Sequence, residues 1–222
     1  MRDVETNART EALGGGATLE FVVPASASEV SPERLPKFEV SGLPGARVAL
    51  RRGFVDLEGA NVHVACVEAP SDRWAPGMED VVFGIANGVA HRAMSERLKL
   101  ERWDAGAIVF QNESFEQKVF GQAKSERSSV KLSGKHVLGF EGPKREVVLC
   151  SALCDEPRDH DQCADILTHT RVDGLVAAPP PSLVVQAVFF AAEKPWDAVG
   201  MAGMLGLLVV GFVLVKRPRP KP

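Results

Sequence analysis

The clearest alternation of apolar and polar positions runs from Asn61 to Glu68. Successive residues of a β-strand point to opposite faces, so Val62, Val64 and Cys66 share one face. The other face is also partly apolar. It carries His63, Ala65 and Val67. Because both faces are partly apolar, this segment is predicted to be a central strand of a sheet.

The pattern then changes to a helical period, which predicts a long helix from about Pro76 to about Leu98. Proline suits the first turn of a helix, and the acidic residues Glu79 and Asp80 suit its N-terminal dipole. One stripe of apolar residues at helical spacing is expected to be buried. It consists of Met78, Val81, Val82, Ile85 and Val89.

Beyond this helix the pattern returns to strands, followed by a second helix over residues 159–171. The expected strands are residues 107–111, 115–121, 129–132, 137–140 and 146–153. Ser133-Gly134-Lys135 is predicted to be a turn between two of them. Runs of strands with helices outside the sheet are typical of an α+β fold. We therefore expect an antiparallel sheet with a long helix and a shorter second helix packed on it.

A different pattern occupies residues 198–215, where 18 consecutive residues are uncharged and almost wholly apolar. As a helix they would extend about 27 Å, close to the roughly 30 Å hydrocarbon core of a bilayer. Trp196 on one side suits the membrane interface, and the basic tail on the other side suits lipid headgroups. The pattern predicts one C-terminal transmembrane helix, with the lipid bilayer as a partner.

Small residues recur every four positions along this predicted helix, at Ala198, Ala202 and Gly206. Such a face lets two membrane helices approach each other closely. These three residues are therefore candidates for a helix–helix contact that would make a homodimer.

The patterns together divide the chain into five parts. They are a disordered or partly ordered lead-in (1–36), an α+β domain (37–178), a Pro-rich linker with an apolar juxtamembrane segment (179–197), the transmembrane helix (198–215) and a basic tail (216–222). This arrangement predicts a single domain of ordinary size tethered to a membrane.

Charge excludes one class of partner and bears on location. The tail carries +4 of a net charge of −3, which leaves −7 for the rest of the chain. An acidic domain has no electrostatic footprint for nucleic acid. The first 16 residues lack the apolar core of a secretory signal, which favours a tail-anchored protein with a cytoplasmic domain. The basic tail favours the opposite orientation, because basic residues prefer the cytoplasmic side.

The cysteines leave two states open. Cys154 and Cys163 flank a loop that can bring them together, so they are candidates for a disulfide in an oxidising compartment. In a reducing one, all four cysteines would be small core residues. Cys150, Cys154 and Cys163 with His160 have a spacing like that of a zinc site. However, Cys150 and Cys154 on one strand would lie about 13 Å apart, too far to share a metal.

Catalytic motifs are weak in this chain. Ser128 and Lys131 form an S-x-x-K pattern, but a strand would place the two side chains on opposite faces. The acidic loop from Asp155 to Asp161 is interpreted as a solvated turn, with Asp159 or Asp161 capping the second helix. We therefore predict no catalytic, cofactor-binding or metal-binding residues.

The order of elements from about Val48 to about Val172 resembles PsbP-like α/β sandwich domains. The resemblance rests on the helix after NVHVACVE, the meander through LSGKHVLGFEG and EVVLCSAL, and the closing helix DQCADILTHTRV. It covers a little over half of the chain and matches no residue-level signature. It implies a binding or assembly-factor domain, usually without catalytic residues of its own.

The leading hypothesis is therefore a non-enzymatic, membrane-tethered binding or scaffolding protein with a protein partner and no cofactor. One alternative is an exported envelope assembly factor with a Cys154–Cys163 disulfide. The other is an enzyme whose site is assembled from scattered residues, which would require a deep pocket with at least two polar groups of shifted pKa.

Overall fold

The structure is a computed structural model that describes residues 5–179, apart from 36–44, 58, 73, 76, 126 and 127. Most of the described chain is strand. The larger sheet has seven strands, and every neighbouring pair is antiparallel. In sheet order they are β3 (Ser28–Glu29), β4 (Arg47–Val55), β5 (Asn61–Ala69), β9 (Glu146–Pro157), β8 (Ser129–Glu141), β7 (Ser114–Lys124) and β6 (Lys99–Gln111).

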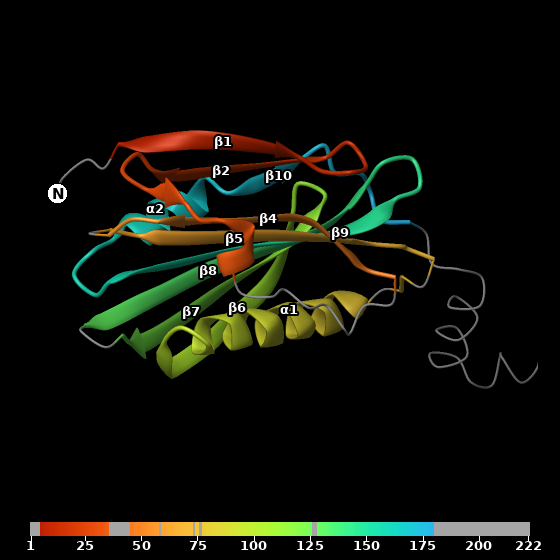
Figure 1. Ribbon diagram of the computed structural model, residues 1–222. Coiled ribbons are helices and arrows are strands. Elements are labelled where there is room, and N and C mark those ends of the chain that lie inside the picture. Colours follow the sequence, from red (N-terminus) through yellow and green to blue (C-terminus); the bar gives the residue numbers. More distant parts are fainter. Residues whose placement is uncertain are drawn as a thin grey trace, which may run out of the picture. The chain divides into compact units, whose positions relative to one another are not determined.

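A smaller sheet and two helices cover the two faces of the larger sheet (Figure 1). The smaller sheet contains β1 (Thr6–Ala12), β2 (Thr18–Pro24) and β10 (Arg171–Asp173), with β2 in the centre. It packs on one face together with α2 (Gln162–Thr168), whereas α1 (Met78–Ser95) packs on the other. A 3-10 turn, η1 (Pro32–Arg34), precedes β4. These elements confirm the α+β class, with an antiparallel sheet, one long helix and one shorter helix.

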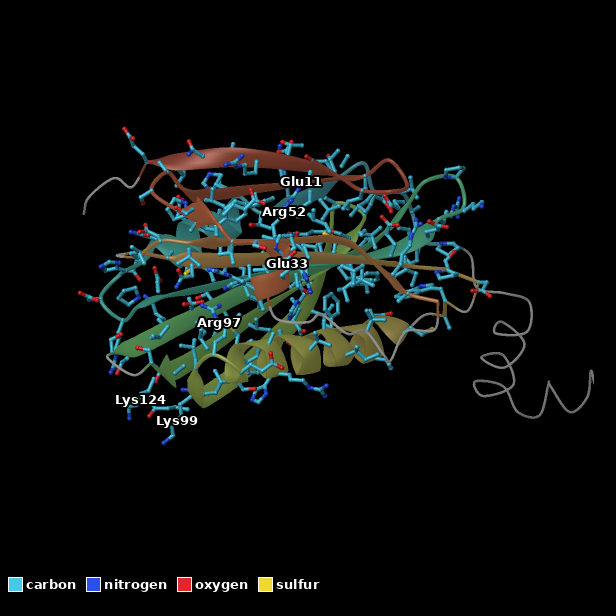
Figure 2. The ribbon with its side chains drawn as sticks, viewed as in Figure 1. Glu11, Glu33, Arg52, Arg97, Lys99 and Lys124 are labelled. Atoms are coloured by element: carbon cyan, nitrogen blue, oxygen red, sulfur yellow. A yellow bond between two sulfur atoms is a disulfide. The ribbon has the colours of Figure 1, made fainter. Side chains whose placement is uncertain are left out.

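The predicted central strand is confirmed, because β5 lies between β4 and β9 and is buried on both faces. Val62, Val64 and Cys66 pack towards the smaller sheet in one apolar cluster. A charged contact adds to this packing at the side of the sheet, where Arg52 of β4 donates to Glu11 of β1 at 3.2 Å (Figure 2).

The predicted turn at Ser133-Gly134-Lys135 is wrong, because β8 runs unbroken through it. At Gly134, the side chains of the neighbouring strands leave no room for a Cβ atom. A side chain at this position would place its Cβ 2.5 Å from Val119 Cγ2 and 2.7 Å from Leu153 Cδ2. Its small size therefore lets β7 and β9 pack closely on either side of β8, and the glycine was mistaken for a chain reversal.

The predicted buried stripe of α1 is also partly wrong. Val82 is buried, but Val81 is 58% exposed. The residues that face the sheet lie about one residue further round the helix. They are Val82, Phe83, Ala86, Ala90, Ala93 and Met94. Apolar residues surround much of the helix, so periodicity alone did not identify the side that packs, whereas the alanines let the backbone lie close to the strands.

Within the predicted lead-in, residues 1–36, the structure places both β1 and β2. Leu19, Phe21 and Val23 of β2 are fully buried and belong to the core between the two sheets. The charged and polar residues of β1 concealed its pairing with β2, which buries only one of the two strands.

The predicted transmembrane helix, including Ala198, Ala202 and Gly206, lies outside the described residues, as do the linker beyond Pro179 and the basic tail. Among the helices that the structure describes, none is long and apolar enough to cross a membrane.

All four cysteines of the chain form disulfides. Cys154 at the end of β9 bonds to Cys163 in α2, and Cys66 of β5 bonds to Cys150, its direct cross-strand neighbour on β9. Disulfides persist in oxidising compartments and are rare in the cytosol, where thiols are kept reduced. The expectation of a cytoplasmic domain is therefore wrong, and the disulfides indicate an exported domain.

Candidate functional site

A chain of buried polar side chains lies between α1 and the larger sheet. Ser151 Oγ of β9 is 2.7 Å from His136 Nδ1 of β8, and His136 Nε2 is 3.2 Å from Asn87 Oδ1 of α1. Asn87 Nδ2 donates to Gln117 Oε1 at 2.8 Å, and Gln117 Nε2 donates to the carbonyl of Gly106 at 2.8 Å. We call this series, from Ser151 to the Gly106 carbonyl, the buried polar chain.

The last acceptor sets the direction of every hydrogen bond in this chain. A carbonyl can only accept, so Gln117 must present its amide nitrogen to Gly106 and its oxygen to Asn87. Asn87 then offers its own oxygen to His136, whose Nε2 must carry the hydrogen. His136 Nδ1 is left as an acceptor for the Ser151 hydroxyl. Burial lowers the pKa of His136 to about 4, which keeps the ring neutral and this tautomer in place.

Ser151 also lines a small cavity beside α1. The cavity has a volume of about 30 Å³, room for one or two water molecules. Its walls are mostly aliphatic, and His63 contributes the ring of a second histidine. The lining includes Leu35, His63, Ala65, Met94, Ser151 and Leu153.

A second buried polar cluster adjoins His63. Arg97 lies just beyond α1, where Figure 2 labels it. It donates to His63 Nε2, and its Nη1 lies 3.6 Å from Asp155 Oδ1. Asn61 Nδ2 donates to the other carboxylate oxygen of Asp155 at 2.8 Å. Burial, assisted by the charge of Arg97, lowers the pKa of His63 to about 3. Burial raises the pKa of Asp155, although Arg97 and Asn61 oppose that shift.

The buried polar chain differs from a hydrolytic triad in two physical respects. A triad needs a histidine that can take the serine proton, stabilised by a carboxylate on its other nitrogen. Here the group on the other nitrogen is the neutral amide of Asn87, and the depressed pKa of His136 disfavours its protonated form. The cavity is also too small for an ordinary substrate. The arrangement suits a structural role better than acyl transfer.

Two further buried carboxylates hold the turn of the β1–β2 hairpin. Glu68 of β5 accepts from the amide of Gly14 at 2.7 Å, and Glu141 of β8 accepts from the amide of Ala17 at 3.1 Å. Arg47 lies 2.5 Å from Glu68 and balances its charge. Burial raises the pKa of Glu141, and the nearby charge of Glu68 adds to the rise. This pair therefore attaches the hairpin to the sheet.

The structure disperses the remaining residues that the sequence singled out. Lys131 contacts Asp161 at 2.6 Å, whereas Ser128 bonds with Ser125, so the S-x-x-K residues do not meet. Asp161 occupies the N-cap position of α2, one of the two expected, but its side chain makes no cap hydrogen bond. Glu156 instead accepts from the backbone amides of Gln162 at 2.7 Å and Cys163 at 3.0 Å.

The cysteines of the zinc-like pattern are all oxidised, so their sulfurs are not available as thiolate ligands. Across the described residues, no group of three or more acidic, histidine or cysteine side chains is arranged to hold a metal ion.

Sequence reasoning missed the buried polar chain and the Cys66–Cys150 disulfide. Asn87, His136 and Ser151 come from three elements, and His136 directly follows the predicted turn at residues 133–135 that does not exist. The usable signal was a polar residue in an otherwise apolar strand: Ser151 interrupts EVVLCSAL, the most apolar strand in the sequence. A buried polar side chain requires a partner, and that requirement pointed to a polar residue on a neighbouring element.

Comparison with known proteins gives no family. No family model matches the chain, and no functionally curated protein matches it. Among solved structures, it is similar to LpqN of Mycobacterium tuberculosis, described as involved in cell envelope biogenesis, at 12% identity over 77% of this chain and 92% of LpqN, with a TM-score of 0.43. A Pseudomonas aeruginosa protein of unknown function, PA94, described as a putative regulator, matches at 14% identity over 79% of this chain and 99% of PA94, with a TM-score of 0.30.

A thioesterase family protein from Silicibacter pomeroyi is also similar, at 17% identity over 51% of this chain and 85% of that protein, with a TM-score of 0.20. All three TM-scores are below 0.5, so these similarities carry no argument about what this chain does. The resemblance to PsbP-like domains stays a prediction, because none of these comparisons tests it.

The two buried histidines predict how stability depends on pH. Their ordinary pKa is 6.5, whereas the folded values are about 3 for His63 and about 4 for His136. Between pH 6.5 and pH 4 the unfolded chain binds more protons than the folded chain, so these groups lower the free energy of unfolding as pH falls. Asp155 and Glu141 have raised pKa values and act in the opposite direction.

The contribution of His136 is isolated by comparing the native chain with His136→Gln, measured by urea denaturation at several pH values from 7 to 4. We expect the variant to be less stable at pH 7 and to lose less stability on acidification. Equal losses in the two proteins would show that His136 is not held neutral by the fold.

Proposed function

We propose that this chain is an exported binding domain of the cell envelope, which holds a partner and does not transform a substrate. The observation that carries the proposal is the pair of buried disulfides. Cys66–Cys150 joins the two central strands, and Cys154–Cys163 joins β9 to α2. Both lie in the core that attaches the smaller sheet, so the fold depends on an oxidising compartment.

The chemistry of the interior supports binding over catalysis. Every polar group of the buried polar chain is directed at another member of the chain, and His136 is a weak base. The cavity beside Ser151 has room only for water. We place the activity on the surface of the domain, with a macromolecule as the partner, because neither the buried polar chain nor this cavity offers room for a substrate.

Residues 198–215 complete the proposal as a membrane tether. With the domain outside, the basic tail of residues 216–222 would lie in the cytoplasm, as the distribution of basic residues in membrane proteins favours. The disulfides and the charge of the tail then both favour the same orientation. A cytoplasmic domain would be inconsistent with both.

Thiol labelling tests the compartment. Cells that express the full-length protein are quenched with acid, and the protein is denatured and treated with a maleimide reagent of known mass, with and without prior reduction. We expect no added mass without reductant and four additions after reduction, one for each cysteine. Alkylation of the unreduced protein would overturn the proposal.

A reporter enzyme fused to the N-terminus checks the same point independently of the cysteines. A reporter that is active only outside the cytoplasm should be active in this fusion.

A further inference from the structure

The exposed edges of the two sheets differ in how they are protected against pairing with another strand. An unpaired edge presents free backbone donors and acceptors, and proteins protect such edges with short strands, charges or bulges. β3 has two residues and β10 has three. β1 is longer, but Arg9 and Glu11 lie on it and its side chains are exposed. Because β3 pairs only with Phe54 and Val55, β4 forms most of that edge, and it carries Arg47, Arg51 and Arg52. All of these edges are protected by length or by charge.

The remaining edge strand, β6, has 13 residues and lies at the end of the larger sheet (Figure 1). Its first half carries charge, with Lys99, Glu101, Arg102 and Asp104. Its register also shifts twice against β7, between Leu100 and Arg102 and between Ala105 and Ile108. Both features discourage edge pairing in this half.

Beyond the second register shift, the second half of β6 has neither charged residues nor a further shift. Residues 105–111, AGAIVFQ, carry no charge, and from Ile108 to Gln111 the ladder with β7 is regular. Val109 is 53% exposed and Phe110 is 61% exposed. Phe110 rests on Phe115 of β7, with 4.9 Å between the ring centroids, which holds the aromatic ring beside the edge. We call residues 108–111 the uncharged edge.

We propose that the uncharged edge of β6 pairs in antiparallel register with the same segment of a second copy of this chain, about a two-fold axis at Val109. In such a pair residue i meets residue j, and j meets i. Val109 lies opposite Val109 of the other copy, and Ile108 lies opposite Phe110 twice. Aromatic and β-branched residues are favourable cross-strand neighbours.

The charges of β6 exclude a register centred in its first half. A two-fold axis at Ala105 would place Glu101 opposite Val109 and Lys99 opposite Gln111, so charged side chains would face the uncharged half. An axis at Val109 leaves all four charged residues outside the paired segment. A second copy also presents an identical uncharged edge, so that pairing protects both edges at once and the assembly closes as a dimer.

A single cysteine on the axis tests the proposal. In the full-length protein, Val109→Cys would place two cysteines directly opposite each other, where the roughly 4.5–5.5 Å between Cα atoms permits a disulfide. Mild oxidation followed by a non-reducing gel should show most of the variant at twice the monomer mass. Phe120→Cys is the matched control, since Phe120 is 51% exposed but lies on β7, one strand in from the edge.

Two outcomes would overturn the proposal: a monomeric Val109→Cys variant, or equal cross-linking of the control. Equal cross-linking would show that the copies meet elsewhere, for example through residues 198–215. Adding Phe110→Lys to the Val109→Cys variant should reduce the cross-linked fraction about tenfold, equivalent to about 1.4 kcal/mol. Adding Phe120→Lys to the Val109→Cys variant instead should leave the cross-linked fraction unchanged. A decrease as large as that caused by Phe110→Lys would also contradict pairing through the uncharged edge.

Discussion

Replacing Cys66 and Cys150 together with alanine is expected to lower the free energy of unfolding by about 4–5 kcal/mol. A disulfide restricts the unfolded chain, and the restriction grows with the number of residues in the closed loop. This disulfide joins residues 84 positions apart. Urea denaturation followed by circular dichroism, with the other disulfide intact, measures the difference. The loss is comparable with the whole stability of many domains, so partial unfolding at 37 °C is expected.

Cys154→Ala with Cys163→Ala is the matched control. All four sulfurs are buried, so the cavities left behind are similar, but this loop spans only nine positions. The same relation gives a loss of about 3 kcal/mol. The decisive result is the order of the two variants. If removal of Cys154–Cys163 were the more costly, α2 and its attachment to β9 would be contributing more than chain entropy.

Replacing Arg97 with methionine is expected to destabilise the folded chain by about 2 kcal/mol at pH 7, below the full cost of breaking a buried pair. Its side chain is 32% exposed, and solvent screens part of the interaction. The substitution leaves Asp155 buried with only Asn61 as a hydrogen-bond donor among the contacts described above. Without the nearby positive charge, the pKa of Asp155 should rise further and the pKa of His63 should rise from about 3.

The sign of the pH dependence distinguishes this cause from a loss of packing. A raised carboxyl pKa favours the folded state at low pH, and that contribution is lost as pH rises through the folded value. The deficit of the variant should therefore shrink between pH 7 and pH 5. NMR titration of the His63 ring reports its pKa directly. Arg92→Met, an exposed position on α1, is the control and should change neither quantity. A pH-independent deficit would contradict the electrostatic account.

Much of the fold could be predicted from local pattern, because burial imposes a period on each element. The alternation in NVHVACVE identified β5 as a central strand, and the loop between Cys154 and Cys163 made that pair a candidate. The pattern failed where spacing had more than one physical meaning. Gly134 serves close packing but was interpreted as a turn, and Val81 belongs to an apolar stripe that does not face the sheet.

The candidate site was less accessible to sequence reasoning, because it depends on register across the sheet. Cys66 and Cys150 meet only because β5 and β9 pair with these residues directly opposite each other. His136 reaches both Ser151 and Asn87 because β8 lies beside β9 and under α1. The spacing of residues within one segment does not reveal which residues of another strand will lie opposite it. The uncharged edge is different: its composition was visible in AIVFQ, but its position at the end of the sheet was not.

The Cys66–Cys150 disulfide also determines how the domain would respond to a pulling force between the proposed membrane tether and the proposed partner. Tension applied at the two ends of the chain would cross from Cys66 to Cys150 through the sulfurs. The intervening residues contain α1, β6, β7 and β8, and they would bear no load. Roughly 280 Å of extensible chain is thereby withheld, at about 3.3 Å for each residue. The edge strand β6 would therefore stay folded while the ends of the chain are stretched.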